Sequence, residues 1–305
     1  MTAGSGAGLD LARFDEVCAV VRARVPYLGC ELLEEASTRD GWIRLSTLGD
    51  DPELLVELVR STGSARGAPS DQVAASLFVQ ALAFRAPSVA IAAWALGLPV
   101  VTLDPALVAV RLRRSRPAVL GVLTTELTRH DVTTLAPAVL DGLLAPVLSA
   151  LRGQIRIGSR LLWSNVAASV AALMRATEDV GPVGDPAVRR RGHQLVAADA
   201  RLAAQGEWET LQAGGATGWY WNRTACCLWY RTTESAGRRC EDCSLTDREE
   251  RTARRLAQLT PAQPAQPAQP GQPAQPAQPG HPARPGQPAR PGQPAPHAQP
   301  EAGSA

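Results

Sequence analysis

The chain has 305 residues and a formal net charge of only +2, because its 31 basic residues, all arginine, are balanced by 29 acidic ones. This balance argues against a general nucleic-acid or membrane-surface binder, which would carry a concentrated excess of one sign. Apolar residues make up 45% of the chain but aromatic residues only 4%. The region from 70 to 175, which is rich in Ala, Leu and Val, therefore favours packed helices.

The N-terminus, MTAGSGAGLDLARFDE, lacks the basic start and the apolar core of a secretory signal, so we expect a cytoplasmic protein. The most apolar stretch, 86–103, is interrupted by Pro87, Gly97 and Pro99. A membrane-spanning helix needs about 20 consecutive apolar residues. The sequence therefore predicts a buried helix and strand here, and no transmembrane segment.

The first predicted elements lie between residues 10 and 45. Apolar residues recur at spacings of three and four from Asp10 to Arg24, which predicts a helix with Cys18 on its apolar face. Cys30 follows a glycine in an expected turn, and nothing marks either thiol as reactive. Residues 42–45 predict a short strand.

The middle of the chain alternates between helix and strand signals. Asp51 before Pro52, and Ser70 before the next apolar run, are N-cap residues that open two helices. Residues 88–98 are apolar nearly all round and predict a central helix. A strand is expected at 99–104, and a hairpin at 106–112 and 118–123 around the arginine-rich turn RRSRP.

Helices are expected again from 133 to 204, with kinks at Pro137 and Pro146 and a helix that opens at Asp185-Pro186. A last short helix follows residue 245. Thr246 and Glu249 stand there in the S/T-x-x-E relation of a capping box.

Four of the six cysteines lie within 18 residues in the pattern CC-x12-C-x2-C: Cys226, Cys227, Cys240 and Cys243. In a reducing cytoplasm such a cluster is more typical of metal binding or redox chemistry than of structural disulfides. Structural zinc sites usually use two C-x2-4-C knuckles, whereas neighbouring side chains in an extended segment diverge. Divergent thiols suit a two-iron cluster, with its four coordination sites on two metals.

The spacing thus favours a 2Fe-2S cluster over a structural zinc ion or thiol redox chemistry, which both stay open. No histidine lies near the cysteines, so a Rieske-type site is not expected. Five aromatic residues flank the adjacent pair and are candidates for shielding a cluster from water: Trp219, Tyr220, Trp221, Trp229 and Tyr230.

The segments RTACCLWYR and CEDCSL together resemble the C-terminal motif of FhuF-like ferric siderophore reductases. The resemblance implies that the four cysteines are the ligands of a 2Fe-2S cluster. Arg223, Leu228, Tyr230, Arg231 and Asp242 match the surroundings of that motif, and Arg160, Trp163 and Asn165 match a segment upstream of it. One departure is the spacing of twelve residues between the cysteine pairs where the family has ten, which lengthens a loop and leaves the exposure of the cluster open.

The resemblance implies an oxidoreductase that transfers one electron to a ferric siderophore in the cytoplasm, so that iron leaves as Fe(II). No catalytic acid, base or nucleophile is expected, because the cofactor supplies the chemistry. No G-x-G-x-x-G follows a strand, so electrons are expected from an external ferredoxin or reductase, and a peripheral contact with an importer is conceivable. Two alternatives remain: a zinc-stabilised binding or scaffold protein, and a 2Fe-2S electron carrier or sensor.

Two arginine groups are candidates for gripping the chelate, although charge runs are usually solvated surface. They are the residues of RLRRSR, namely Arg111, Arg113, Arg114 and Arg116, and the residues of RRR, namely Arg189, Arg190 and Arg191.

The predicted fold class is α+β, predominantly helical with a β-hairpin and a small C-terminal cysteine-rich iron-sulfur subdomain. The predicted domains are a body at 1–215, the cysteine subdomain at 216–259 and a disordered tail at 260–305. Proline falls on every third residue from Pro261 to Pro294 of that tail, a polyproline II pattern that cannot form a core.

Overall fold

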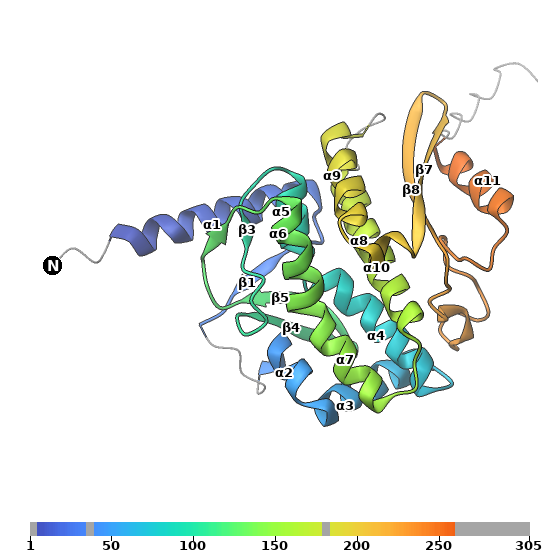
Figure 1. Cartoon of the computed structure of the whole chain (residues 1–305), viewed down its shortest axis with the longest axis horizontal. Coiled ribbons are helices and arrows are strands. Elements are labelled where there is room, and N and C mark those ends of the chain that lie inside the picture. The colour runs from blue at the N-terminus through green and yellow to red at the C-terminus, as the bar shows by residue number, and fades with distance from the viewer. Residues whose placement is uncertain (1–4, 35–39, 179–183, 260–305) are drawn as a thin grey trace, which may run out of the picture. The chain divides into compact units, whose positions relative to one another are not determined.

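The computed structural model describes residues 5–34, 40–178 and 184–259. The predicted tail lies outside the described residues. The described residues form one compact unit. Helices and small sheets alternate along it, so the fold is mixed α+β and predominantly helical (Figure 1). A separate iron-sulfur subdomain stays a prediction.

Helices make up most of the described residues. They are α1 (Ser5–Arg24), α2 (Leu45–Asp50), α3 (Pro52–Arg66), α4 (Asp71–Arg85), α5 (Ser88–Ala95), α6 (Val132–Pro137), α7 (Ala145–Gln154), α8 (Ser159–Glu178), α9 (Pro186–Ala197), α10 (Ala200–Ala203) and α11 (Arg248–Leu259), with a π-helical turn η2 (Ala138–Leu144) and a 3-10 turn η3 (Trp229–Arg231).

The strands form three small sheets. A four-stranded sheet has the order β1-β5-β4-β2, in which only the β1–β5 pair is parallel, and two-stranded sheets join β3 to β6 and β7 to β8. The strands are β1 (Cys30–Leu32), β2 (Trp42–Arg44), β3 (Val100–Val101), β4 (Val108–Arg113), β5 (Arg116–Val122), β6 (Leu127–Thr128), β7 (Gly206–Ala213) and β8 (Ala216–Arg223).

Three helices begin at the N-cap residues that the sequence predicted. The carboxylate of Asp51 accepts from the backbone N–H of Leu54 at 2.9 Å and opens α3. Ser70 and Asp185 cap α4 and α9 in the same way. Such caps satisfy backbone donors that have no partner inside the helix, so they act within a few residues.

The last helix begins differently from the prediction. Asp247, not Thr246, caps α11, because its carboxylate accepts from the backbone N–H of Glu249 at 2.8 Å. The hydroxyl of Thr246 is buried and has no hydrogen-bond partner among the described residues. The capping-box prediction was therefore wrong by one residue.

Four strands were not predicted: β1, the short β6, and the two strands of the β7–β8 hairpin. Cys30 lies in β1, where it pairs with Leu120 of β5, and not in a turn. The β7–β8 hairpin turns at Gly214 and Gly215, whose φ angles of +58° and +80° are those of a tight hairpin turn. A Gly-Gly pair between two extended runs signals such a hairpin, so the sequence did contain this clue.

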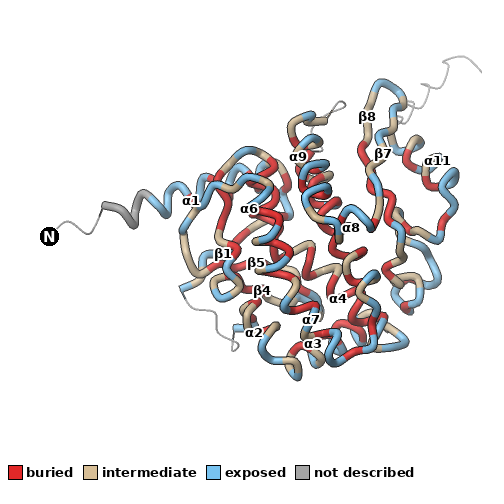
Figure 2. The backbone as a smooth tube through the Cα atoms, viewed as in Figure 1, coloured by how far each residue is buried: buried red, intermediate tan, exposed pale blue. Residues whose placement is uncertain are grey.

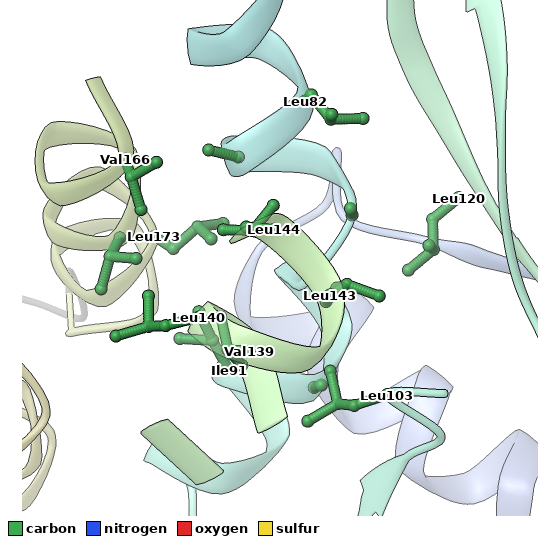
Figure 3. Close-up of a cluster of buried hydrophobic side chains, with 14 of the residues drawn as sticks. Leu82, Ile91, Leu103, Leu120, Val139, Leu140, Leu143, Leu144, Val166 and Leu173 are labelled. Atoms are coloured by element: carbon green, nitrogen blue, oxygen red, sulfur yellow. The ribbon is translucent and has the colours of Figure 1, made fainter. Parts of the chain in front are cut away.

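The core lies where α4, α5, η2 and α8 meet the four-stranded sheet. Figure 3 shows Leu82 from α4, Ile91 from α5, Leu144 from η2 and Leu173 from α8 within one buried cluster. Figure 2 shows the same pattern along the chain, with buried residues concentrated on these helices. Burial of apolar surface here is the main stabilising term.

One helical stretch, Val132–Gln154, is long and apolar enough by composition to cross a membrane, with a mean hydropathy of 1.7. The bent pair α4 and α5 passes the same test, with a 45° break between them. Half of the most apolar window of Val132–Gln154 is buried inside the protein, as in a core helix. These stretches are weak evidence of a span.

Candidate functional site

The structure brings the four clustered cysteines together. Cys226 and Cys227 follow β8, and Cys240 and Cys243 lie in the loop before α11. The Sγ atoms of Cys226 and Cys243 are 3.7 Å apart, and those of Cys227 and Cys240 are 3.9 Å apart. A tetrahedral metal with metal–sulfur bonds of 2.3 Å holds two sulfur ligands about 3.8 Å from each other. Each pair thus spans one edge of such a tetrahedron.

Each sulfur pair joins one cysteine of the adjacent Cys226-Cys227 dipeptide to one cysteine of the C-x2-C segment. The adjacent thiols of Cys226 and Cys227 take different partners, one from each end of the C-x2-C segment. Within the described part of the chain, no group of three or more His, Cys, Asp or Glu side chains is placed to hold a single metal ion. The two sulfur pairs adjoin each other, because the Cys227 thiol interacts with the thiols of both Cys226 and Cys240.

The four thiols differ in exposure, and the pKa values of three of them are shifted. Cys227 and Cys243 are each 1% exposed, whereas Cys226 and Cys240 are half-buried. Hydrogen bonds from the Cys226 and Cys240 thiols lower the pKa of Cys227 far below its usual range, and the charge of Arg223 lowers it further. The same hydrogen bonds to Cys227 raise the pKa of Cys226 and Cys240. A lowered pKa favours the thiolate of Cys227, which is the form in which a cysteine binds a metal cation.

A buried polar network connects the segment of Cys226 and Cys227 to the helical body. The guanidinium of Arg223 donates to Oδ1 of Asn165 at 2.6 Å, and the amide of Asn165 donates to Oγ of Ser76 at 2.8 Å. Ser76 Oγ donates in turn to the backbone carbonyl of Cys227 at 2.7 Å. Asn165 and Ser76 are fully buried on α8 and α4. Because buried polar groups are costly without partners, this network specifies where β8 and Cys227 sit.

Helix α11 holds the C-x2-C segment, with Cys240 and Cys243, in place. Arg251 donates to the carbonyl oxygens of Cys243 at 2.9 Å and Thr246 at 2.7 Å. Arg255, which is 1% exposed, donates to the carboxylate of Asp242 at 2.8 Å. Asp242 lies between the two cysteines of the C-x2-C segment, so α11 holds that segment at two points.

The longer loop between the cysteine pairs docks on the end of α3. The backbone N–H of Thr233 donates to the carbonyl of Gly67 at 3.0 Å, and that of Glu234 donates to the carbonyl of Arg66 at 3.3 Å. The Arg66 side chain also pairs with Glu234 at 2.5 Å. The twelve-residue spacing thus makes contacts with the body of the protein.

Replacement of Gly67 by alanine should lower the free energy of unfolding by about 2 kcal/mol. Gly67 has a φ of +62°, and an added Cβ would lie 1.7 Å from Oγ1 of Thr233. The measurement is the midpoint of urea unfolding. Gly153→Ala is the matched control, because Gly153 lies in α7 with nothing within 4 Å of an added Cβ. It should stabilise the protein by about 0.5 kcal/mol, and equal midpoints for both variants would contradict the docking role of Gly67.

The aromatic residues near the motif divide into two groups. Trp219, Tyr220 and Trp221 lie on β8 and are at most 4% exposed. The ring of Trp219 stacks on that of Trp208 from β7 at 3.6 Å, a partner that the sequence analysis did not single out. Trp229 and Tyr230, in η3, are half-buried, and one residue, Leu228, separates them from Cys227. A shielding role for these residues stays a prediction.

Three arginines of the two groups make structural contacts, and the other four are exposed. Arg111 pairs with Glu31 at 3.1 Å, Arg189 pairs with Glu178 at 2.6 Å, and Arg191 donates to the carbonyl of Ala95 at 2.6 Å. The following four are exposed: Arg113, Arg114, Arg116 and Arg190. Of both groups, only Arg116 lines a cavity beside the cysteines.

The residues upstream of the motif play different parts. Asn165 belongs to the polar network just described. Trp163 is half-buried beneath the guanidinium of Arg201, which lies 4.4 Å from its ring centroid, and Arg160 is exposed. The remaining cysteines, Cys18 and Cys30, are buried free thiols that hydrogen-bond each other, a contact that their separation in sequence concealed.

A scan of the chain against protein-family models found no match, and a search of curated proteins found none similar in sequence.

Proposed function

We propose that this protein is a 2Fe-2S ferric siderophore reductase, in which Cys226, Cys227, Cys240 and Cys243 hold the cluster. The single observation that supports this most is the arrangement of the four sulfurs as two pairs, 3.7 and 3.9 Å apart. The donor set fits the group, since four cysteines are the usual ligands of a 2Fe-2S cluster. When bound, this cluster supplies electrons one at a time, which is what reduction of Fe(III) to Fe(II) requires.

The protein's own residues would hold the ligands in place and control access to them. Arg223 and Ser76 position the backbone around Cys227, and Arg251 and Arg255 position the C-x2-C segment. Such supporting contacts orient ligands and tune a metal site. The half-buried Cys226 and Cys240 mark the sides of the site that are open to other molecules.

The reaction moves one electron from an external donor, a ferredoxin or reductase, to the ferric chelate. The donor is oxidised, Fe(III) becomes Fe(II), and no bond in the organic chelator breaks. Hard oxygen ligands hold the lower-charged Fe(II) more weakly, so the metal is released. We place this reaction in the cytoplasm, because thiol ligands need reducing surroundings.

Anaerobic purification followed by visible spectroscopy tests the proposal. The protein should be red-brown, bleach on addition of dithionite, and regain its colour when a ferric hydroxamate or ferric catecholate is added, while an Fe(II)-specific dye reports the product. Bleaching without Fe(II) formation from either chelate would favour an electron carrier or sensor. A colourless protein with one zinc ion would overturn the redox proposal and favour the scaffold alternative.

A further inference from the structure

A cavity of about 480 Å³ opens beside the cysteine site. Its walls come from α4, α8, the first residues of β5 and the C-x2-C segment, and Cys240 is one of its lining residues. Leu77, Phe84 and Pro117 supply apolar surface. The volume is in the range of sites that bind small molecules.

The charges that line the cavity favour an anion. Four arginines face two carboxylates there, and both carboxylates already have cationic partners. Glu241 pairs with Arg175 at 3.7 Å, and Asp242 pairs with Arg255 at 2.8 Å. The lining arginines are Arg66, Arg85, Arg116 and Arg223.

Three of these arginines form no ion pair in the described part of the chain: Arg85, Arg116 and Arg223. The charge of Arg116 does act on Glu234, which is the ion-pair partner of Arg66. The Nε atom of Arg85 is buried and has no hydrogen-bond partner among those residues. Its Nη1 donates to the backbone carbonyl of Tyr27 at 3.3 Å, and the guanidinium carbon lies 5.9 Å from the centroid of the Phe84 ring. A partly desolvated cation with a spare donor is stabilised when an anion binds beside it.

The hairpin turn brings Arg116 to the cavity. Ser115 has a φ of +59° in the two-residue turn between β4 and β5. Its carbonyl accepts a hydrogen bond from the Thr62 hydroxyl, and its own hydroxyl accepts one from Ser61 at 3.0 Å. These contacts with α3 fix the turn, so Arg116 is held at the cavity although its side chain is exposed.

We propose that this cavity is the substrate site and that it selects ferric complexes of anionic catecholate ligands over uncharged hydroxamate complexes. The inference rests on the proposed function and adds the chemical class of the chelate. A ferric complex of catecholates carries net negative charge, whereas hydroxamates neutralise the ferric ion. Guanidinium groups bind such oxygen anions through paired N–H donors, and the apolar wall with Phe84 suits the aromatic rings of a catecholate. A complex bound there lies against Cys240.

The test measures binding and not turnover. Gallium(III) takes the ligands of Fe(III) but is not reduced by the protein, so titration calorimetry of the full chain with gallium catecholate and gallium hydroxamate complexes of similar size reports the cavity alone. We expect the catecholate complex to bind at least about tenfold more tightly, and Arg116→Gln and Arg85→Gln to weaken it about tenfold each. Added salt should weaken it too.

Arg113→Gln is the matched control, because Arg113 is exposed on the same hairpin but does not line the cavity. It should leave the affinity within about twofold. If Arg85→Gln does not fold by circular dichroism, the exposed Arg116 still tests the site. Equal affinities for the two complexes, or unchanged affinity in Arg116→Gln, would overturn the inference even if the protein reduces ferric chelates. Tight, Arg116-dependent binding of the gallium catecholate with no Fe(II) formation would instead uphold the cavity and overturn the proposed function.

Discussion

Cys227→Ser should leave the anaerobically purified protein with less than about one tenth of the wild-type iron. Cys227 is 1% exposed, takes part in one of the two sulfur pairs, and has a thiol whose pKa is lowered by hydrogen bonds from Cys226 and Cys240. A serine hydroxyl at this position does not ionise near neutral pH and is a poor ligand for iron in a sulfur site. Iron per chain and visible absorbance measure the effect, with far-UV circular dichroism to verify folding.

Cys18→Ala is the control for this substitution. Cys18 is also buried but lies on α1, apart from the four-cysteine motif. Its replacement should leave the iron content unchanged. Wild-type iron in Cys227→Ser would show that the motif does not hold the metal, and the ligand assignment would then be wrong.

Arg255→Met should lower the free energy of unfolding by about 3 kcal/mol. The Arg255 guanidinium is 1% exposed and donates to four acceptors. They are Glu209 at 3.1 Å, Asn222 at 2.7 Å, the carbonyl of Trp221 at 3.2 Å and Asp242 at 2.8 Å. Methionine fills much of the space but leaves these acceptors without their donor. Because the Asp242 side chain is 39% exposed and can regain water, we expect the loss to lie at the lower end for a broken buried ion pair.

The midpoint of urea unfolding measures this loss, and Arg254→Met on the same helix is the control. The Arg254 side chain is 50% exposed and pairs with Glu250 one turn away, so its replacement should cost less than about 0.5 kcal/mol. In addition, Arg255→Met should release iron faster to a chelator, since Asp242 lies within the C-x2-C segment. Similar unfolding midpoints for both variants would show that the Arg255 network does not stabilise the fold.

Sequence patterns predicted the elements whose signals are local. The caps at Asp51, Ser70 and Asp185 each satisfy backbone donors two or three residues ahead, so the residues involved are neighbours in the chain. The β4–β5 hairpin was predicted for the same reason, since both strands flank a short turn. The error at Thr246 arose because two adjacent residues were both acceptable caps.

Contacts between distant segments could not be predicted in this way. The strand at Cys30 forms through parallel pairing with β5, about 90 residues away in the chain, and three residues carry too weak a signal on their own. Likewise, Ser76 carried no signal in the sequence, and although Asn165 and Arg223 match the family motif, nothing in the sequence showed that the three side chains contact one another. Their role becomes visible only where α4, α8 and β8 pack together.

The sequence alone determined the four-cysteine motif, the helical nature of the body and the helix caps, because spacing, periodicity and capping act over a few residues. Only the tertiary structure decided that Cys226 pairs with Cys243 and Cys227 with Cys240, and that Arg85 and Arg116 line one cavity beside Cys240. The physical reason is that burial, charge pairing and the directions of thiols depend on packing between segments far apart in the chain.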